Sequence, residues 1–302
     1  MESQAKAEIQ LTARPRQRLG SRLSRQLRRE GWLPASLYGA VGPYALQVER
    51  KAIEQLFRQE GARSRLIRLH VENGAGGEPS GSYPVLLGPQ ALSDLLRPLV
   101  ASLDGKAVEK GFSPWAGRLG QQVSGPRVTL VDDGTLPFAP HTAPFDGEGT
   151  PCRQTPLLVE GRLETYYLDR RTAARLGLAP TGNGLRSLGS QPAPAPTNLI
   201  LKGGRRHHRE ILADLREGVY IESLLGAWAG NPYAGEVQGN VSLGFLVRDG
   251  QPVGRIKNCL LAANAFDAFA HRLAELSSDA RWVGAELLPY ALFEGIPLSA
   301  AS

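Results

Sequence analysis

The spacing of polar and apolar residues divides the chain into a short N-terminal stretch and a longer C-terminal stretch. In the short stretch, strands are predicted at 7–13, 33–38, 44–48 and 66–71, and helices at 21–30 and 51–59. Ser21 is a suitable cap for the first helix. The second helix would turn Ile53, Leu56 and Phe57 inward. These elements predict a small module of strands and helices.

The longer stretch contains several hairpins and interspersed helices. Strands are predicted at 84–87, 127–131, 198–201 and 219–224, hairpins at 157–160/162–168 and 241–248/253–261, and helices at 89–103, 172–176, 207–217 and 266–276. Pro89 suits the first turn of its helix, and Gly161 and Asp249-Gly250 mark the two hairpin turns. This order predicts an α+β domain with a largely antiparallel sheet.

Residues 74–82 form a Gly/Ser-rich segment that cannot bury a face and is typical of a flexible linker. The expected domains are therefore 1–73 and 83–302, with the linker at 74–82. A module of the first size lies near the limit at which one core suffices, whereas the second is long enough to bury a core well.

Charge separates the two domains more sharply than composition does. Apolar residues make up 42% of the chain and charged residues 21%, as in ordinary globular proteins. Residues 1–74 hold 14 Lys/Arg and 7 Asp/Glu, while the remainder holds 21 basic and 22 acidic residues. Only the N-terminal module therefore has an electrostatic reason to bind a polyanion.

The two cysteines are too few for a disulfide framework and favour a reducing, cytoplasmic setting. No segment has the pattern of a signal peptide or a membrane span, so no membrane partner is expected.

Seven arginines fall within sixteen residues of the N-terminal module, with no acidic residue among them: Arg14, Arg16, Arg18, Arg22, Arg25, Arg28 and Arg29. Such a cluster repels itself unless a polyanion neutralises it. A guanidinium group pairs with phosphate oxygens and stacks on bases, which favours RNA. A solvated charged face is the alternative.

A family resemblance supports RNA. The residues that carry it are Gly20, Ser24-Arg25-Gln26-Leu27-Arg28-Arg29, Gly31 and Leu33-Pro34-Ala35-Ser36-Leu37-Tyr38-Gly39. They resemble the opening of the bacterial large-subunit ribosomal protein that binds 5S ribosomal RNA (the Ctc/general-stress family), over about residues 7–72. The resemblance implies 5S rRNA or the ribosome as a partner, and RNA contacts by Arg22, Arg25, Arg28, Arg29 and Tyr38. The family's later strands are absent, which implies an incomplete, partial β-barrel-like module.

The C-terminal domain carries a second resemblance, on six segments in matching order across residues 83–297. The segments are Leu119–Val123, Thr129–Asp133, Pro144–Gly149, Tyr167–Asp169, Thr181–Gly184 and Pro196–Leu199. They resemble the PmbA/TldE branch of the TldD/PmbA (modulator of DNA gyrase) metalloprotease family. The resemblance implies a TldD-like zinc subunit and unfolded peptide as partners, with Phe145, Asp146, Glu148 and Asn183 as peptide-cleft residues.

The catalytic subunit of that family is similar to zinc peptidases in carrying a His-Glu-x-x-x-His helix, whose histidines hold zinc while the glutamate activates water. At the corresponding positions this chain has Arg97, Pro98 and Ser102. None of these side chains supplies the missing ligands or base, so the resemblance implies no zinc in this helix. No other cofactor is expected.

Other polar residues gave weaker candidates. Asp132 and Asp133 are adjacent in a predicted strand and should point to opposite faces, which favours loop anchoring over paired catalysis. The Pro144–Gly149 loop fits either a tight turn or a peptide-contacting loop. Adjacent His207 and His208 in a helix should diverge by about 100°, which argues against a metal pair.

Neither Cys152 nor Cys259 has a histidine partner in the sequence, and no Ser-His-Asp arrangement is indicated. The protein is therefore expected to be inactive alone, as a partner subunit of a TldD-type protease in peptide processing. The alternatives are a 5S rRNA-binding or ribosome-binding protein, an autonomous hydrolase, and a fusion in which neither module is fully functional.

Overall fold

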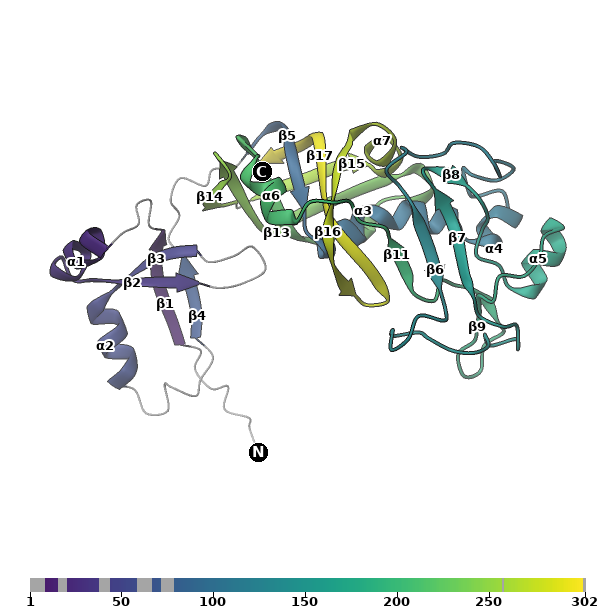
Figure 1. The fold of residues 1–302 in the computed structure, drawn as a ribbon, viewed down its shortest axis with the longest axis horizontal. Helices are drawn as coiled ribbons and strands as arrows, with labels where there is room; N and C mark the ends of the chain where they lie inside the picture. Colours follow the sequence, from purple (N-terminus) through teal and green to yellow (C-terminus); the bar gives the residue numbers. More distant parts are fainter. Residues whose placement is uncertain are drawn as a thin grey trace. The chain divides into compact units, whose positions relative to one another are not determined.

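The computed structural model describes residues 9–15, 21–37, 44–58, 67–71, 79–256 and 258–300 (Figure 1). The chain divides near Gly76 into two compact units. Within the described residues, no helix is both long enough and apolar enough to cross a membrane.

The first unit is a four-stranded sheet with two helices. Its elements are β1 (Ile9–Pro15), α1 (Ser21–Arg29), β2 (Trp32–Leu37), β3 (Tyr44–Glu49), α2 (Arg50–Arg58) and β4 (Ile67–Val71). The strand order is β2-β3-β1-β4, and the β1–β4 pair is parallel while the others are antiparallel. These strands and helices agree with those predicted from the sequence.

The core of this unit is small. Its buried members come from β1, β3 and α2: Leu11, Ala13, Leu46, Val48 and Leu56. Ile53 packs against them at the edge. Phe57 was predicted to face inward, but 57% of it is exposed, so that prediction is wrong. A nine-residue helix buries one row of side chains here, and Leu56 occupies it.

The second unit contains the remaining elements. Its strands are β5 (Gly81–Leu87), β6 (Leu130–Asp133), β7 (Gln154–Val159), β8 (Arg162–Leu163), β9 (Gly184–Leu185), β10 (Ala193–Pro194), β11 (Leu199–Leu201), β12 (Glu217–Leu225), β13 (Glu236–Arg248), β14 (Gln251–Arg255), β15 (Cys259–Asn264), β16 (Leu273–Val283) and β17 (Glu286–Ala300). Its helices are α3 (Pro89–Ser102), α4 (Gly105–Glu109), α5 (Arg170–Leu176), α6 (His208–Ala213) and α7 (Ala265–Asp267), with short 3-10 helices at Ala227–Ala229 and Pro232–Ala234 and a π-helix at Ala268–Arg272.

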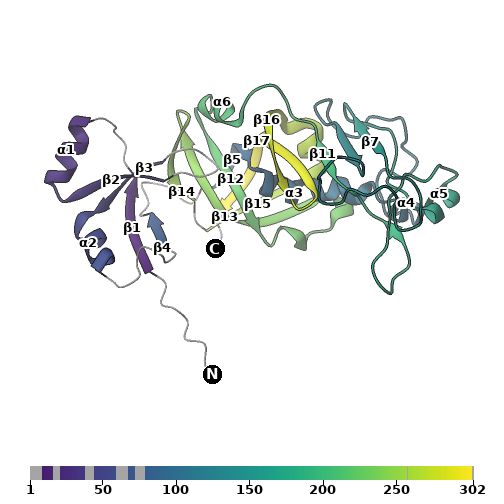
Figure 2. The ribbon, with the colours of Figure 1, turned by 60° about the horizontal axis from the view of Figure 1, so that its bottom comes forward.

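Five of these strands close into a barrel. In the order β13-β12-β5-β17-β15 each strand pairs with the next, and β15 pairs back with β13. The sheet continues from β17 through β11, β6, β7 and β8, which lie beyond the barrel (Figures 1 and 2). Within this sheet the β5–β12 and β11–β17 pairs are parallel and the other described pairs antiparallel. The predicted α+β class with a largely antiparallel sheet is confirmed.

Helix α3 is buried over most of its surface. Its buried apolar side chains include Ala91, Leu92, Leu95, Leu96 and Leu99, all at 0% exposure, and the helix packs against β12 and β17. Pro89 lies in the first turn, as predicted, because its missing N–H would have no partner there. Burying this many leucines makes α3 a main element of the hydrophobic core.

The predicted helix at 266–276 is wrong in its second half. Helical backbone ends at Arg272, and Leu273 begins β16. Leu273 and Leu276 fit a helical face by spacing, but β16 pairs them with Phe293 and Ala291 of β17. Long-range strand pairing therefore overrides the local pattern.

Further boundaries differ from the predictions. The strand expected at 162–168 is confined to β8, and the strand expected at 127–131 is observed as β6. The helix expected at 207–217 is confined to α6, and the strand expected at 253–261 is split into β14 and β15. Strand β5 begins at Gly81, inside the segment expected to be linker.

Candidate functional site

Two loops that are far apart in sequence are tied together by Asp146. Its Oδ1 accepts hydrogen bonds from the backbone N–H groups of Glu148 (2.9 Å) and Thr150 (2.8 Å). Its Oδ2 accepts from the N–H of Gly184 at 2.9 Å, while Gly147 N–H donates to the Gly184 carbonyl at 2.8 Å. Asp146 thus shapes its own turn and fixes that turn to β9.

Glycine is required where these two loops touch. A Cβ atom on Gly184 would lie 2.7 Å from Glu148 Oε2 and 3.0 Å from Asp146 Oδ2. A Cβ atom on Gly147 would lie 2.6 Å from the Cβ of Arg186. Side chains at these positions would force the loops apart.

Glu148 connects the same loop to α5. Its Oε2 accepts a hydrogen bond from the N–H of Arg170, the first residue of α5, at 2.7 Å. A carboxylate at this end of a helix is favourable, because the first N–H groups have no partner within the helix. Phe145 beside it is 57% exposed, and Leu185 of the facing loop is 58% exposed. The two loops therefore present apolar side chains on a polar frame.

Asp132 organises the buried side of the loops. It is 1% exposed, and it accepts hydrogen bonds from Thr197 N–H (2.7 Å), Thr197 Oγ1 (2.9 Å) and Asn183 Nδ2 (2.6 Å). Burial raises its pKa to about 6, although the hydrogen bonds from Asn183 and Thr197 act in the opposite direction. The side chain is an anchor for two loops rather than an exposed acid.

Asp133 anchors a different turn. Its Oδ1 accepts from the N–H (2.8 Å) and the hydroxyl (2.7 Å) of Thr135, and its Oδ2 accepts from Gln154 Nε2 at 3.2 Å. Because Asp132 and Asp133 serve separate partners, the expectation that they do not form a paired site agrees with the structure.

The predicted cleft residues come together, but not in equal roles. Phe145 is exposed, Asp146 and Glu148 are half-buried, and Asn183 is only 2% exposed. Asn183 donates to Asp132 and to the Ala195 carbonyl (3.0 Å), and its Oδ1 has no hydrogen-bond partner among the described residues. Sequence reasoning missed that Thr197 and Gly184 complete this frame. The signal was present, since both lie in segments that carried the family resemblance.

Both cysteines lie where burial raises the pKa of the thiol. Cys152 Sγ lies 3.7 Å from the Gly182 carbonyl oxygen, and its pKa is raised by burial first and then by Asp146 and Asp132. Cys259 Sγ lies 3.7 Å from the Pro79 carbonyl, and burial raises its pKa to about 11. Burial therefore disfavours the thiolate, the form needed for nucleophilic attack, at both cysteines.

Helix α3 offers no ligands at the positions where the resemblance would put zinc. Arg97 is exposed, and Ser102 is fully buried with its hydroxyl donating to the Pro98 carbonyl at 2.8 Å. The Ser113 hydroxyl donates to the Ser102 carbonyl at 2.6 Å. The residues present therefore do not fit a zinc ion, and the polar groups at this end of α3 serve the helix and its neighbour instead.

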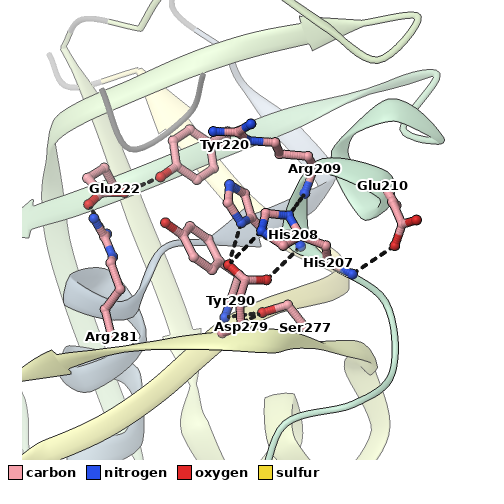
Figure 3. A network of polar contacts seen from close by, with 10 residues as sticks. All are labelled: His207, His208, Arg209, Glu210, Tyr220, Glu222, Ser277, Asp279, Arg281 and Tyr290. Carbon is pink, nitrogen blue, oxygen red and sulfur yellow. Dashed lines mark hydrogen bonds and ion pairs between the residues drawn. The ribbon is translucent and has the colours of Figure 1, made fainter. Parts of the chain in front are cut away.

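The adjacent histidines do not diverge as predicted. His207 lies before the first turn of α6 with an extended backbone, φ −70° and ψ 146°, so the 100° helical rotation does not separate it from His208. Their rings lie 4.5 Å apart and both face Asp279 (Figure 3). Among the described residues, these three form a group of side chains spaced closely enough for a metal ion.

In the N-terminal unit, the predicted RNA-binding residues gather on α1. Arg22 belongs to this helix, and Arg25, Arg28 and Arg29 are exposed. Residues three and four apart lie on one face of a helix, so Arg25, Arg28 and Arg29 present one basic surface. Tyr38 lies outside the described residues.

Solved structures share the fold of the second unit. TldE from Thermococcus kodakarensis is similar at a TM-score of 0.69 and 24% identity, over 74% of this chain and 51% of that one. A protein from Thermotoga maritima described as a modulator of a DNA gyrase is similar at a TM-score of 0.69 and 27% identity, over 89% and 61%. The closed barrel with its buried helix is therefore a fold shared with these two proteins.

The chain belongs to the PmbA/TldA metallopeptidase family, because the family's C-terminal domain matches residues 80–300. A metalloprotease TldD homolog from Haemophilus influenzae is 29% identical over 70% of this chain and 43% of its own length. Residues 11–87 match the ribosomal L25p family. Both resemblances inferred from the sequence are thus confirmed. The chain spans 43% to 58% of the length of the first curated relatives it matches.

Proposed function

We propose that the C-terminal unit is a partner subunit, without the family's catalytic zinc, of a TldD-type zinc metalloprotease acting in peptide processing or proteolysis. One observation carries this proposal: the buried Ser102 hydroxyl is committed to the Pro98 carbonyl on α3, beside an arginine. Because neither Arg97 nor Pro98 can ligate zinc or activate water, this chain would need another subunit to supply that chemistry.

Two loops of the second unit are the parts that we infer a partner subunit would use. Asp146 and Glu148 hold two loops in a fixed arrangement through backbone N–H groups. Phe145 and Leu185 remain exposed on those loops. Asn183 lies on the buried side of the loops, and its hydrogen bond to Asp132 fixes the loop that carries Leu185. We infer that Phe145 contacts unfolded peptide. Asp146, Glu148 and Asn183 hold the loops that place Phe145.

Cytoplasmic localisation forms part of the proposal. Both cysteines are free, which suits a reducing compartment.

The test is co-expression of the chain with a TldD-like chain, followed by a peptidase assay with and without a chelator. The isolated chain should be inactive, and hydrolysis should appear only in the complex and be lost on chelation. In the complex, Phe145→Ala should raise KM for peptide. The matched control is Phe112→Ala, since Phe112 is similarly exposed at 59% but lies outside the two loops. Chelator-resistant hydrolysis by the isolated chain would contradict the proposal.

A second candidate function is supported by the N-terminal unit. The L25p match and the exposed arginines of α1 favour binding of 5S rRNA or the ribosome. Failure of the chain to associate with a TldD-like subunit, together with its recovery in ribosomal fractions, would favour this candidate. Failure of both associations would favour a fusion in which neither unit is functional.

A further inference from the structure

Two segments about 70 residues apart in sequence bring three potential metal ligands together. His207 and His208 lie at the start of α6, and Asp279 lies in β16. Asp279 Oδ2 is 2.6 Å from His208 Nδ1 and 3.7 Å from His207 Nε2. Figure 3 shows the three side chains facing one another. One ligand atom from each residue lies within 4.8 Å of the others.

The backbone around the group holds it in place without any metal. Asp279 Oδ1 accepts from the N–H of His208 at 2.9 Å, and the Asp279 carbonyl accepts from the Ser277 hydroxyl at 2.7 Å. The His208 ring stacks on Tyr290 with centroids 3.9 Å apart, and only 6% of the His208 side chain is exposed. His208 and Asp279 are therefore held next to each other before a metal arrives, which lowers the entropic cost of binding.

We propose that His207 Nε2, His208 Nδ1 and Asp279 Oδ2 form a binding site for one zinc ion or a similar transition metal. Two imidazoles and one carboxylate are a donor set that suits zinc, nickel or copper, whereas magnesium and calcium prefer oxygen ligands alone. The site reaches solvent, because the His207 side chain is 46% exposed and that of Asp279 is 28% exposed. Water can complete a tetrahedral coordination from that side.

Metal binding replaces two hydrogen bonds. In a neutral His208 whose Nδ1–H donates to Asp279 Oδ2, that proton moves to Nε2 when Nδ1 binds the metal, whereas an imidazolium would release its Nδ1 proton to water. His208 Nδ1 and Asp279 Oδ2, which lie 2.6 Å apart, separate so that both can contact one ion. His207 Nδ1 accepts a long hydrogen bond of 3.2 Å from the Arg209 N–H. Coordination through Nε2 moves the His207 proton to Nδ1 and ends that bond. The other half of the helix cap remains, since Glu210 Oε2 accepts from the His207 N–H at 2.8 Å.

This site is separate from the helix that defines the proposed function, because none of its three residues lies on α3. Its bound metal would link α6 to β16 across the surface of the second unit. The competing interpretation is a purely structural His208–Asp279 pair that binds no metal. The two interpretations differ in whether a metal binds and whether its affinity depends on His207.

The experiment titrates the untagged full-length chain with Co²⁺, followed by visible absorption, and then displaces Co²⁺ with Zn²⁺. We expect one metal per chain, displacement by Zn²⁺ and no displacement by Mg²⁺. His207→Ala should weaken affinity at least about tenfold, since even loss of an outer-shell partner costs that much. His141→Ala and His271→Ala are the matched controls, because both histidines are exposed and lie outside the group.

Asp279→Asn should also weaken binding. Because Asp279 anchors the His208 backbone, the circular dichroism spectrum of that variant must first match the wild type; His207→Ala provides the test if it does not. Lack of saturable binding by the wild type would overturn the proposal. Equal affinity in wild type and His207→Ala, or equal weakening by the control substitutions, would also overturn it. None of these outcomes depends on peptidase activity or on a partner chain.

Discussion

Asp132 is surrounded by donors, yet burial dominates its titration. The hydroxyl and N–H of Thr197 and the amide of Asn183 all favour the ionised form, but burial raises the pKa from 3.8 to about 6. The protonated form is therefore favoured in the folded state relative to the unfolded chain. A frame that joins two loops thus contains a group that titrates near neutrality.

This shift predicts a pH dependence of stability. Between about pH 4 and pH 6 the folded state binds more protons at Asp132 than the unfolded state does. The stabilising contribution is therefore full below the unfolded pKa and is lost as pH rises through the folded pKa. The loss should be about 3 kcal/mol at most. Urea unfolding at several pH values measures the free energy of unfolding. That free energy should fall less steeply with rising pH in Asp132→Asn than in the wild type. Asp214→Asn is the control for removing one charge. Identical slopes in wild type and Asp132→Asn would contradict the assignment.

The contact between Gly147 and Gly184 gives a second prediction at this scale. Gly184→Ala would place a methyl group 2.7 Å from Glu148 Oε2, so the loops must separate or the glutamate must leave the N–H of Arg170. We expect a loss of about 1–3 kcal/mol in the free energy of unfolding. The neighbouring exposed Leu185→Ala should change it by less than about 0.5 kcal/mol. Chemical denaturation measures both, and equal effects would show that close approach at Gly184 is unimportant.

At the scale of elements, the exposed basic surface of α1 follows directly from the spacing of its arginines. Its arginines recur at three- and four-residue intervals, and those described are exposed. This surface could be predicted because it depends on local sequence alone. The same holds for the hairpin turns at Gly161 and Asp249-Gly250, where Asp249 and both glycines have the positive φ that such turns require.

The arginines of α1 should dominate the salt dependence of RNA binding. With about five phosphate contacts, log affinity should fall with log salt at a slope of about −3 to −5. Replacing Arg25, Arg28 and Arg29 by alanine should reduce the magnitude of the slope by about 2 to 3. Lys51→Ala with Arg58→Ala, two basic residues of α2, is the control. Filter binding of 5S rRNA over a salt series gives the slopes, and an unchanged slope in the α1 variant would exclude this surface.

Elements that depend on distant partners were harder to predict. The spacing of Leu273 and Leu276 fits a helix, and only the pairing with β17 makes this segment a strand. The proximity of His207 and His208 depends on the extended backbone of one capping residue. The bond between Asp146 and Gly184 joins residues 38 positions apart, which no local pattern encodes. Sequence therefore predicted the residue types of the site better than their contacts.

At the scale of the whole molecule, the two units differ greatly in the size of their cores. The first has five buried apolar residues in its core cluster, whereas the second contains most of the buried residues of the described chain. A domain with so small a core is expected to be marginally stable. The +7 charge of residues 1–74 adds self-repulsion at low salt.

Thermal unfolding should therefore show two transitions rather than one. The lower one should belong to the first unit, and it should move to higher temperature when 5S rRNA is added, because a ligand that binds only the folded form stabilises that form. A fragment of residues 77–302 should retain the upper transition alone and should bind RNA more weakly than the full chain. Differential scanning calorimetry and the same filter assay measure these outcomes. Equal RNA affinity of the fragment and the full chain would rule out RNA binding by the first unit.

The closed barrel also determines when this protein can fold during synthesis. Strand β17 pairs with β5, β11, β15 and β16, and it is the last strand of the described chain to be translated. Until Glu286–Ala300 has left the ribosome, β5 and β15 have unpaired edges, although β5 was translated about 200 residues earlier. Such edges favour pairing with other nascent chains. The growing polypeptide should thus depend on chaperones that hold it until β17 emerges.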